Sequence, residues 1–157
     1  MAIGLNFQPE VRRRQMKINY PAVLVAGIVH WILGAVWYGI FSTKFIELIA
    51  WTPEQLKAVE SQNHAKEYIL AFLSSLVLVY ILAHFIQYTN ATTVAGGLQT
   101  AFWLWLGFIV TTQLATVIFE GRKPGLYLLN IGYQFVACLV AGALLSIWRA
   151  RGSSAET

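Results

Sequence analysis

The sequence contains little charge and no aspartate. Only 11% of its 157 residues are charged, and all seven acidic residues are glutamates. Charged residues make up about a quarter of an ordinary soluble domain, so this composition excludes that class. Apolar residues are abundant instead: 57% of the chain is hydrophobic and the mean hydropathy is +0.59. We therefore expect an integral membrane protein.

Cysteine and recognisable catalytic motifs are almost absent as well. Cys138 is the only cysteine, which excludes an internal disulfide and a CxxC metal or redox pair. The sequence has no HExxH, GxSxG, Walker or GxGxxG pattern. It also has no pair of acids inside an apolar stretch of the kind that holds a metal or shuttles protons. We therefore expect a protein that is not an enzyme, with no metal site and no cofactor.

The chain does contain four apolar stretches that are each long enough to cross a bilayer as a helix, which takes about 20 residues. They cover approximately residues 22–41, 68–88, 94–119 and 126–148. The sequence therefore predicts an all-α integral membrane fold with four transmembrane helices in one domain, residues 21–148. We assign residues 1–20 to a basic flank before this domain and residues 149–157 to a tail after it.

The loop that follows the first apolar stretch is too polar to cross a membrane, because charged residues are interleaved with apolar ones along it. Within it, Thr52-Pro53-Glu54-Gln55 has the features of a helix start. Thr52 can cap the helix, Pro53 suits its first position and Gln55 can complete a capping box. This pattern predicts a short amphipathic helix from about Pro53 that lies at the membrane interface in the first outer loop.

Lysine and arginine are divided almost evenly between the two sides of a four-helix topology, so the residues next to the first helix decide the orientation. A basic cluster directly precedes that helix and comprises Arg12, Arg13, Arg14 and Lys17. We therefore place both termini in the cytoplasm, and the protein in the cytoplasmic membrane of a bacterium. The cluster suits the anionic inner leaflet better than a nucleic acid, so no nucleic-acid partner is expected.

Polar residues recur in the outer halves of the third and fourth apolar stretches. They are Gln113, Thr116, Glu120 and Arg122 at the end of the third, and Asn130, Tyr133 and Gln134 in the fourth. Spacings of three and four residues put Gln113, Thr116 and Glu120 on one helix face, and the three residues of the fourth stretch also share a face. The two faces lie at matching depth, so they can meet.

Two interpretations of this polar cluster follow from the cost of an unpaired amide or hydroxyl in hydrocarbon, which is several kcal/mol. In the first, the residues form interhelical hydrogen bonds that fix the hairpin, each worth roughly 0.6 kcal/mol. In the second, they line a polar pocket open to the outer face, with Glu120 and Arg122 at its mouth, where a substrate or ion path begins. Glu120 and Arg122 can also be read as a simple solvated turn.

His30 lies close to the middle of the first apolar stretch. Ala26 and Gly34, four residues before and after it, place small side chains on the same helix face, where a flat macrocycle has room. His30 is therefore a candidate ligand for a chlorin or a haem. The interpretation that we favour is a neutral His30 that is hydrogen-bonded to a neighbouring helix.

Several short motifs, taken together, resemble a known family. They are Asn19-Tyr20, Gly34-Ala35-Val36-Trp37-Tyr38-Gly39, Thr52-Pro53-Glu54-Gln55, Phe119-Glu120-Gly121-Arg122 and Leu129-Asn130-Ile131-Gly132-Tyr133. Over about residues 18–148 the chain resembles the four-helix bacterial and fungal membrane proteins catalogued as domain of unknown function 1761. The resemblance implies a four-helix membrane domain and no established activity.

Two functional hypotheses remain. The first is a non-enzymatic structural or accessory subunit that packs small-residue faces, such as Cys138/Gly142 and Ala137/Ala141, against a second copy or a larger membrane complex. The second is a small transporter or channel whose path is lined by the outer polar cluster. We favour the first, because the inner half of the bundle is almost wholly apolar and offers no exit. The expected partners are the lipid bilayer and either other membrane subunits or the chain itself.

Overall fold

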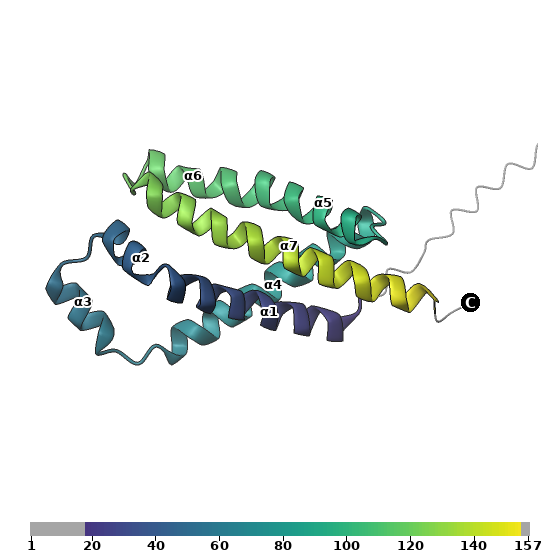
Figure 1. Ribbon diagram of the computed structural model, residues 1–157, viewed down its shortest axis with the longest axis horizontal. Coiled ribbons are helices and arrows are strands. Elements are labelled where there is room, and N and C mark those ends of the chain that lie inside the picture. Colours follow the sequence, from purple (N-terminus) through teal and green to yellow (C-terminus); the bar gives the residue numbers. More distant parts are fainter. Residues whose placement is uncertain (1–17, 155–157) are drawn as a thin grey trace, which may run out of the picture.

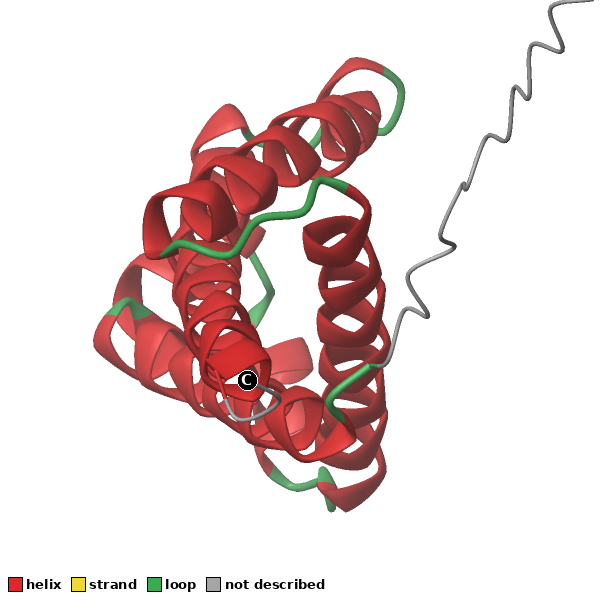
Figure 2. Cartoon of the chain, turned by 90° about the vertical axis from the view of Figure 1, so that its right-hand side faces the viewer, coloured by secondary structure: helices red, strands yellow, loops and turns green. Residues whose placement is uncertain are grey.

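The computed structural model describes residues 18–154, with side chains described as far as residue 149. Most of the predicted basic flank, including its Arg and Lys cluster, lies outside the described residues. The described part of the chain consists of helices and short loops, with no strand (Figure 2). Its elements are α1 (Tyr20–Ile40), α2 (Ser42–Ile49), α3 (Pro53–Glu60), α4 (Ala65–Tyr88), α5 (Val94–Leu104), the π-helical segment η1 (Trp105–Val110), α6 (Thr111–Ile118) and α7 (Pro124–Ser154).

Four helical stretches are long and apolar enough to cross a membrane, so the predicted all-α membrane fold is confirmed. They are Tyr20–Ile40, Ala65–Tyr88, Val94–Ile118 and Pro124–Arg149. The third is made of α5, η1 and α6 in succession. The start of α1 and the end of α7 lie at one end of the molecule, whereas α2 and α3 lie at the other (Figure 1).

Local side-chain caps start three of the helices, among them α5, where Thr93 Oγ1 accepts a hydrogen bond from the backbone nitrogen of Gly96 at 3.1 Å. Asn19 caps α1, since its Oδ1 accepts a hydrogen bond from the backbone nitrogen of Ala22 at 3.1 Å. The capping box expected before α3 is present. Thr52 Oγ1 accepts from the backbone nitrogen of Gln55 at 3.3 Å, and Gln55 Oε1 accepts from that of Thr52 at 2.9 Å. These interactions are local in sequence, which is why the sequence could predict them.

The helix α2, which the sequence did not predict, follows α1 after a single residue. It ends at Ile49, because the next residue, Ala50, has a φ of 56° that breaks the helical path. It packs against the start of α7, where Lys123 Nζ donates a hydrogen bond to the carbonyl oxygen of Glu47 at 3.0 Å. Gly125 allows the close approach, because a Cβ there would lie only 2.7 Å from Leu48 Cδ2. The first loop is therefore tied to the last helix.

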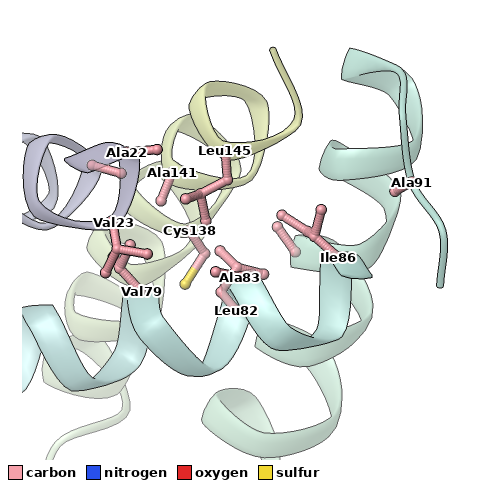
Figure 3. Packing of buried hydrophobic residues seen from close by; sticks show 12 residues of the cluster. Ala22, Val23, Val79, Leu82, Ala83, Ile86, Ala91, Cys138, Ala141 and Leu145 are labelled. Carbon is pink, nitrogen blue, oxygen red and sulfur yellow. The ribbon is translucent and has the colours of Figure 1, made fainter. Parts of the chain in front are cut away.

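The last helix, α7, is the centre of the fold, because it packs against α1, α2, α4, α5 and α6. An apolar core surrounds its second half, at the end of the molecule away from α2 and α3 (Figure 3). Alanines contribute much of this core, and Ala26, Ala101 and Ala137 are fully buried. Small side chains let the helices approach closely.

The small-residue faces of α7 are used inside the chain. Ala137, Cys138, Ala141 and Gly142 are all buried there. Cys138 belongs to the same apolar cluster as Leu82 of α4 (Figure 3). These are the faces that we expected to pack against a second copy or a larger complex. Because neighbouring helices of the same chain already cover them, they are not available to a partner.

Arg149 of α7 closes the turn between α4 and α5. Its guanidinium donates hydrogen bonds to the carbonyl oxygen of Ile86 at 2.6 Å and to Asn90 Oδ1 at 2.7 Å. A third contact reaches the carbonyl oxygen of Ala91 at 3.4 Å. Asn90 itself has a φ of 53°. The arginine thus adds a charged donor to the Ile86 carbonyl, which also accepts from the backbone nitrogen of Ala91 at 3.0 Å, and ties the end of α7 to this turn.

The third transmembrane stretch, residues 94–118, is the one least covered by the rest of the chain. Only 6% of its most apolar window is buried, against 28–39% for the other three. Its π-helical segment η1 closes each hydrogen bond over five residues where an α-helix uses four, so later side chains are rotated about the axis. Thr111 and Thr112, directly after η1, donate to the carbonyls of Gly107 and Phe108. Their hydroxyls are therefore satisfied within the helix.

Candidate ligand-binding crevice

A crevice of about 550 Å³ lies between α1, α4 and α7, in the half of the molecule next to α2 and α3. Its volume falls in the range of about 300–1,000 Å³ that is usual for small-molecule sites. The lining residues are His30, Trp31, Gly34, Ala35, Tyr38 and Gly39 of α1, Tyr68, Ala71, Ser74, Ser75 and Leu78 of α4, and Tyr133 and Gln134 of α7. All three helices thus contribute polar side chains to one space.

His30 is the centre of the polar network in this crevice, and it is 2% exposed. Its Nδ1 lies 3.0 Å from Ser75 Oγ of α4 and 3.2 Å from Tyr133 Oη of α7. The Tyr133 hydroxyl also donates to the carbonyl oxygen of His30 at 3.3 Å. One imidazole therefore joins the three helices that form the crevice.

A second polar pair closes the network on the side of α2. Tyr38 Oη of α1 donates a hydrogen bond to Asn130 Oδ1 of α7 at 2.8 Å. The rings of Tyr38 and Tyr133 lie 5.6 Å apart, and that of Tyr133 lies 5.6 Å from the imidazole of His30. Because Tyr38 and Tyr133 both pair with the opposite helix, they fix the spacing of α1 and α7.

Two polar atoms at this site lack a hydrogen-bond partner among the described residues. They are His30 Nε2 and Gln134 Oε1, both buried. The Gln134 side chain interacts with the imidazole of His30, but the two do not meet at the distance and angle of a hydrogen bond. Burying such groups unpaired is unfavourable by about 1–3 kcal/mol each. Both residues line the crevice, so its wall holds two buried polar atoms whose hydrogen bonding is incomplete.

The residues predicted to form one outer polar cluster are divided between two places. Asn130, Tyr133 and Gln134 belong to the crevice and face α1 and α4. Thr116 Oγ1 donates to the carbonyl oxygen of Gln113 in its own helix at 2.8 Å. Between these two groups of predicted residues, the described part of the chain has no hydrogen bond. The expectation that their faces pair does not hold, because Asn130 and Tyr133 pair with α1. The residues of α7 that contact the third stretch, Tyr127 and Ile131, meet Val110 and Trp105 instead.

Glu120 and Arg122 form an ion pair in the turn before α7. Arg122 Nε lies 2.8 Å from Glu120 Oε2, and both side chains are about half exposed, at 54% and 52%. Gly121, between them, has a φ of 67°, which a glycine adopts without a steric penalty. The pair thus has the character of a solvated turn, and it does not line the crevice.

Different residues hold the third transmembrane stretch against α7. Trp105 Nε1 donates to the carbonyl oxygen of Ile131 at 2.8 Å, and Tyr127 Oη donates to that of Val110 at 3.1 Å. Sequence reasoning missed these bonds, because a backbone acceptor carries no sequence signal. It also missed Ser75 as the partner of His30. Both lie ten residues from the starts of antiparallel helices, and their matching depth was the available signal.

The helix face around His30 does not stay open for a macrocycle. Tyr133 lies against Gly34, since a Cβ on Gly34 would be 2.9 Å from Tyr133 Oη. Ala26, on the other side of His30, is fully buried in the core. The small residues that suggested room for a chlorin or haem therefore accommodate side chains of the same protein.

Comparison with known proteins places the crevice inside a family domain. A family model described as "Protein of unknown function (DUF1761)" matches residues 21–146, which include every residue that lines the crevice. No curated protein matches the chain, and neither does any solved structure.

Proposed function

The chain belongs to the DUF1761 family of proteins of unknown function, and we propose that it is a non-enzymatic membrane protein that binds a small molecule between α1, α4 and α7. One observation carries this proposal: His30 Nε2 and Gln134 Oε1 are buried at the crevice without a hydrogen-bond partner. In a membrane no bulk water reaches such groups. A bound molecule with polar groups of its own satisfies them.

The chemistry of the lining supports binding rather than catalysis. Ser75 Oγ and His30 Nδ1 are 3.0 Å apart, as in a nucleophile and its base. A catalytic pair of this kind also needs a third group that orients the base. None of the described residues that line the crevice is acidic, lysine, arginine or cysteine. The pair therefore lacks a carboxylate that would polarise the imidazole.

The packing beyond the crevice supports binding rather than conduction. The crevice reaches Leu78 on α4, and the next turns of α4 carry Val79, Leu82 and Ala83, which are buried in the apolar core. Buried side chains of α1 and α7 fill the space beside them. A polar path across this half of the bundle would require the core to open.

Filling the crevice tests the proposal. Ala71→Phe adds a ring to the lining, and Ala115→Phe adds the same ring to an exposed position of α6 outside it. Each protein is purified gently from its native membrane, and small molecules are extracted and measured by mass spectrometry. We expect one molecule to be recovered with both the wild type and Ala115→Phe. The same molecule should be missing from Ala71→Phe. Equal recovery from all three would contradict the proposal.

We propose as a second candidate that the protein works as a subunit of a homo-oligomer, through the third transmembrane stretch. Gly107, Thr111 and Ala115 recur at intervals of four residues and are exposed. Small residues at this spacing favour close helix contacts in membranes. The same stripe on a second copy can face it across a twofold axis. Because the faces of α7 are used internally, this stripe replaces them as the candidate contact surface.

Mass measurement of the protein in lipid nanodiscs tests this second candidate. A double substitution, Gly107→Leu with Ala115→Leu, places bulky side chains on the stripe. Val77→Leu on the exposed face of α4 is the matched control. We expect a dimer for the wild type and the control, and a monomer for the double variant. A wild-type monomer would exclude the candidate.

We also propose that both ends of the domain lie in the cytoplasm of a bacterial cell, with α2 and α3 outside. The start of α1 and the end of α7 lie on the same side of the bundle, which supports a common compartment for both (Figure 1). Alkaline phosphatase fused after Ser61 is expected to be active, because the enzyme needs an oxidising compartment. A fusion after Thr92, at the other end, is expected to be inactive. The reverse pattern would invert the orientation.

A further inference from the structure

We infer that the crevice binds an uncharged, mainly apolar molecule through a hydroxyl group that lies between His30 and Gln134. The inference rests on the proposed function, because it names the class of ligand for the same site. It depends on the donor and acceptor character of two buried atoms, on the absence of charge in the lining, and on the aromatic walls.

The side-chain oxygen of Gln134 requires a ligand that donates a hydrogen bond. A glutamine side-chain oxygen can only accept, and Gln134 Oε1 is buried without a partner. Tyr133, its neighbour in the sequence, has its hydroxyl engaged with His30. A ketone, an ether or an ester oxygen has no proton to give and leaves Oε1 unpaired. The ligand therefore carries an O–H or N–H group at this point.

The second nitrogen of His30 requires that the same group also accepts. The Tyr133 hydroxyl donates to the carbonyl oxygen of His30 at 3.3 Å. We assign Nδ1 as the acceptor in this network, with the Ser75 hydroxyl, 3.0 Å away, as its donor. The ring proton of a neutral imidazole is then on Nε2, which becomes a donor. A single hydroxyl accepts from His30 Nε2 and donates to Gln134 Oε1 with one oxygen atom.

The lining excludes a charged ligand group. No lysine, arginine, aspartate or glutamate is among the described residues that line the crevice. A carboxylate or an ammonium group there would lose its hydration without a counter-charge, which is strongly unfavourable. A neutral hydroxyl loses much less and regains two hydrogen bonds.

The walls suit an apolar body attached to that hydroxyl. Trp31 packs edge-on against Tyr68 and Phe72, with ring centres 6.5 Å and 6.0 Å away. Trp31, Tyr68, Tyr38 and Tyr133 all line the crevice, so aromatic rings surround much of it. Aromatic side chains offer apolar surface and specific packing to a flat or flexible hydrocarbon. The ligand class is therefore an amphipathic alcohol or phenol of the kind that partitions into membranes.

A matched pair of probes tests the hydroxyl. Tritiated 4-hexylphenol and 4-hexylanisole differ in whether the ring oxygen carries hydrogen or methyl. The full-length protein in nanodiscs is incubated with each, and retention is corrected with empty nanodiscs. We expect wild type to retain the phenol about two- to tenfold better, which is the affinity carried by one neutral hydrogen bond. Gln134→Leu should reduce this preference to about one, whereas Gln113→Leu on α6 should keep it.

The outcomes separate this inference from the proposed function. If the wild type retains both probes equally, or retains neither, the hydroxyl inference is overturned. This comparison uses only the wild-type protein, so it does not depend on whether a variant folds. A preference that survives in folded Gln134→Leu also overturns the inference. A Soret or chlorin band in the wild-type fraction, lost in His30→Leu, would identify a different ligand class and overturn it too. If both probes bind equally and Ala71→Phe removes both, the crevice binds and only the hydroxyl inference fails.

Discussion

Gly97 of α5 and Gly142 of α7 face each other where the two helices cross. A Cβ on Gly142 would lie 2.6 Å from the carbonyl oxygen of Gly97, and one on Gly97 would overlap the carbonyl oxygen of Gly142. Both obstructions are backbone atoms, which cannot move aside as a flexible side chain can. The pair therefore sets how closely the third transmembrane stretch approaches the central helix.

Gly142→Ala is expected to push α5 and α7 apart and to destabilise the protein by about 1–3 kcal/mol, the usual cost of overpacking a tight contact. Thermal unfolding in detergent, followed by circular dichroism, measures the change. With both variants compared as detergent-solubilised monomers, Gly107→Ala is the matched control, because a Cβ on Gly107 would meet no atom within 4 Å beyond its own stretch of helix. Its midpoint should stay the same or rise slightly, since alanine favours helix more than glycine does. Equal losses in both variants would show that the contact is not tight.

Arg149→Met is expected to loosen the turn between α4 and α5. The substitution removes three hydrogen bonds from the guanidinium to that turn and leaves carbonyl groups of the turn without those donors. Hydrogen bonds to charged groups contribute about 1.5–3 kcal/mol when well formed, and partial exposure lowers this, so we expect a loss of about 1–3 kcal/mol. Faster amide hydrogen exchange at residues 86–91 would localise it.

Two further variants make the Arg149 experiment decisive. Arg149→Lys keeps the charge but not the planar fork of donors, so it should recover only part of the stability. Lys57→Met removes a positive charge from α3, far from the turn, and should leave exchange at residues 86–91 unchanged. An Arg149→Met protein with wild-type exchange would mean that the clamp adds no stability.

Ser75→Ala and Tyr133→Phe each remove one hydroxyl partner of His30 Nδ1 and should be coupled. Interhelical hydrogen bonds in membranes contribute on average about 0.6 kcal/mol, with a maximum near 1.7, so each single variant should lose an amount in this range. The double variant should lose more than the sum, because the imidazole nitrogen then has no partner. Unfolding of the four proteins in one detergent gives the coupling energy. Strict additivity would indicate that the two hydroxyls act independently.

The carboxylate of Glu47 links the stability of α2 to pH. Hydrogen bonds from Lys44 at 2.8 and 2.9 Å, followed by its positive charge and that of Lys123, lower the pKa of Glu47 below its ordinary value. Because the folded-state pKa is the lower one, this stabilisation is present above the unfolded-state pKa. It is lost as the pH falls through the folded-state pKa.

Lys44→Met is therefore expected to raise the pKa of Glu47 toward its ordinary value. The side-chain carboxyl carbon of glutamate, followed by NMR between pH 2 and 7, reports the titration directly. Lys57→Met on α3 should leave the Glu47 titration where it is in the wild type. An unchanged pKa in Lys44→Met would show that the ion pair does not persist in solution.

Properties that depend on neighbouring residues could be predicted from the sequence. The four transmembrane helices followed from uninterrupted apolar stretches, and the start of α3 followed from Thr52 and Gln55, which pair within one turn. The helix α2 could not be predicted, because its N-cap residue, Phe41, gives it no side-chain cap, and eight residues without such a signal form a stable helix only with outside support. That support comes from Lys123 and Gly125, which are distant in sequence.

The partners of the polar residues were harder to predict, because depth in a membrane does not determine rotation about a helix axis. Tyr127 is level with Val110 and Gly142 with Gly97. Gln113 and Thr116 therefore lie nearer the turn than Asn130 and Tyr133, which also face α1. The π-helical segment η1 contributes to this outcome, since it rotates the residues that follow Val110 relative to a continuous α-helix. Hydropathy and spacing carry no signal for such a rotation, so the crevice could not be assembled from the sequence alone.

The burial of Cys138 makes its thiol a reporter of helix separation. It is 3% exposed in the core and is the only sulfhydryl in the chain. A maleimide therefore reacts with the native protein only when α7 moves away from its neighbours. When the labelling reaction is slow compared with reclosing of the bundle, the labelling rate measures the population of that open state, and added ligand should slow labelling if it binds the closed bundle. One natural residue thus gives a binding assay that needs no engineered probe.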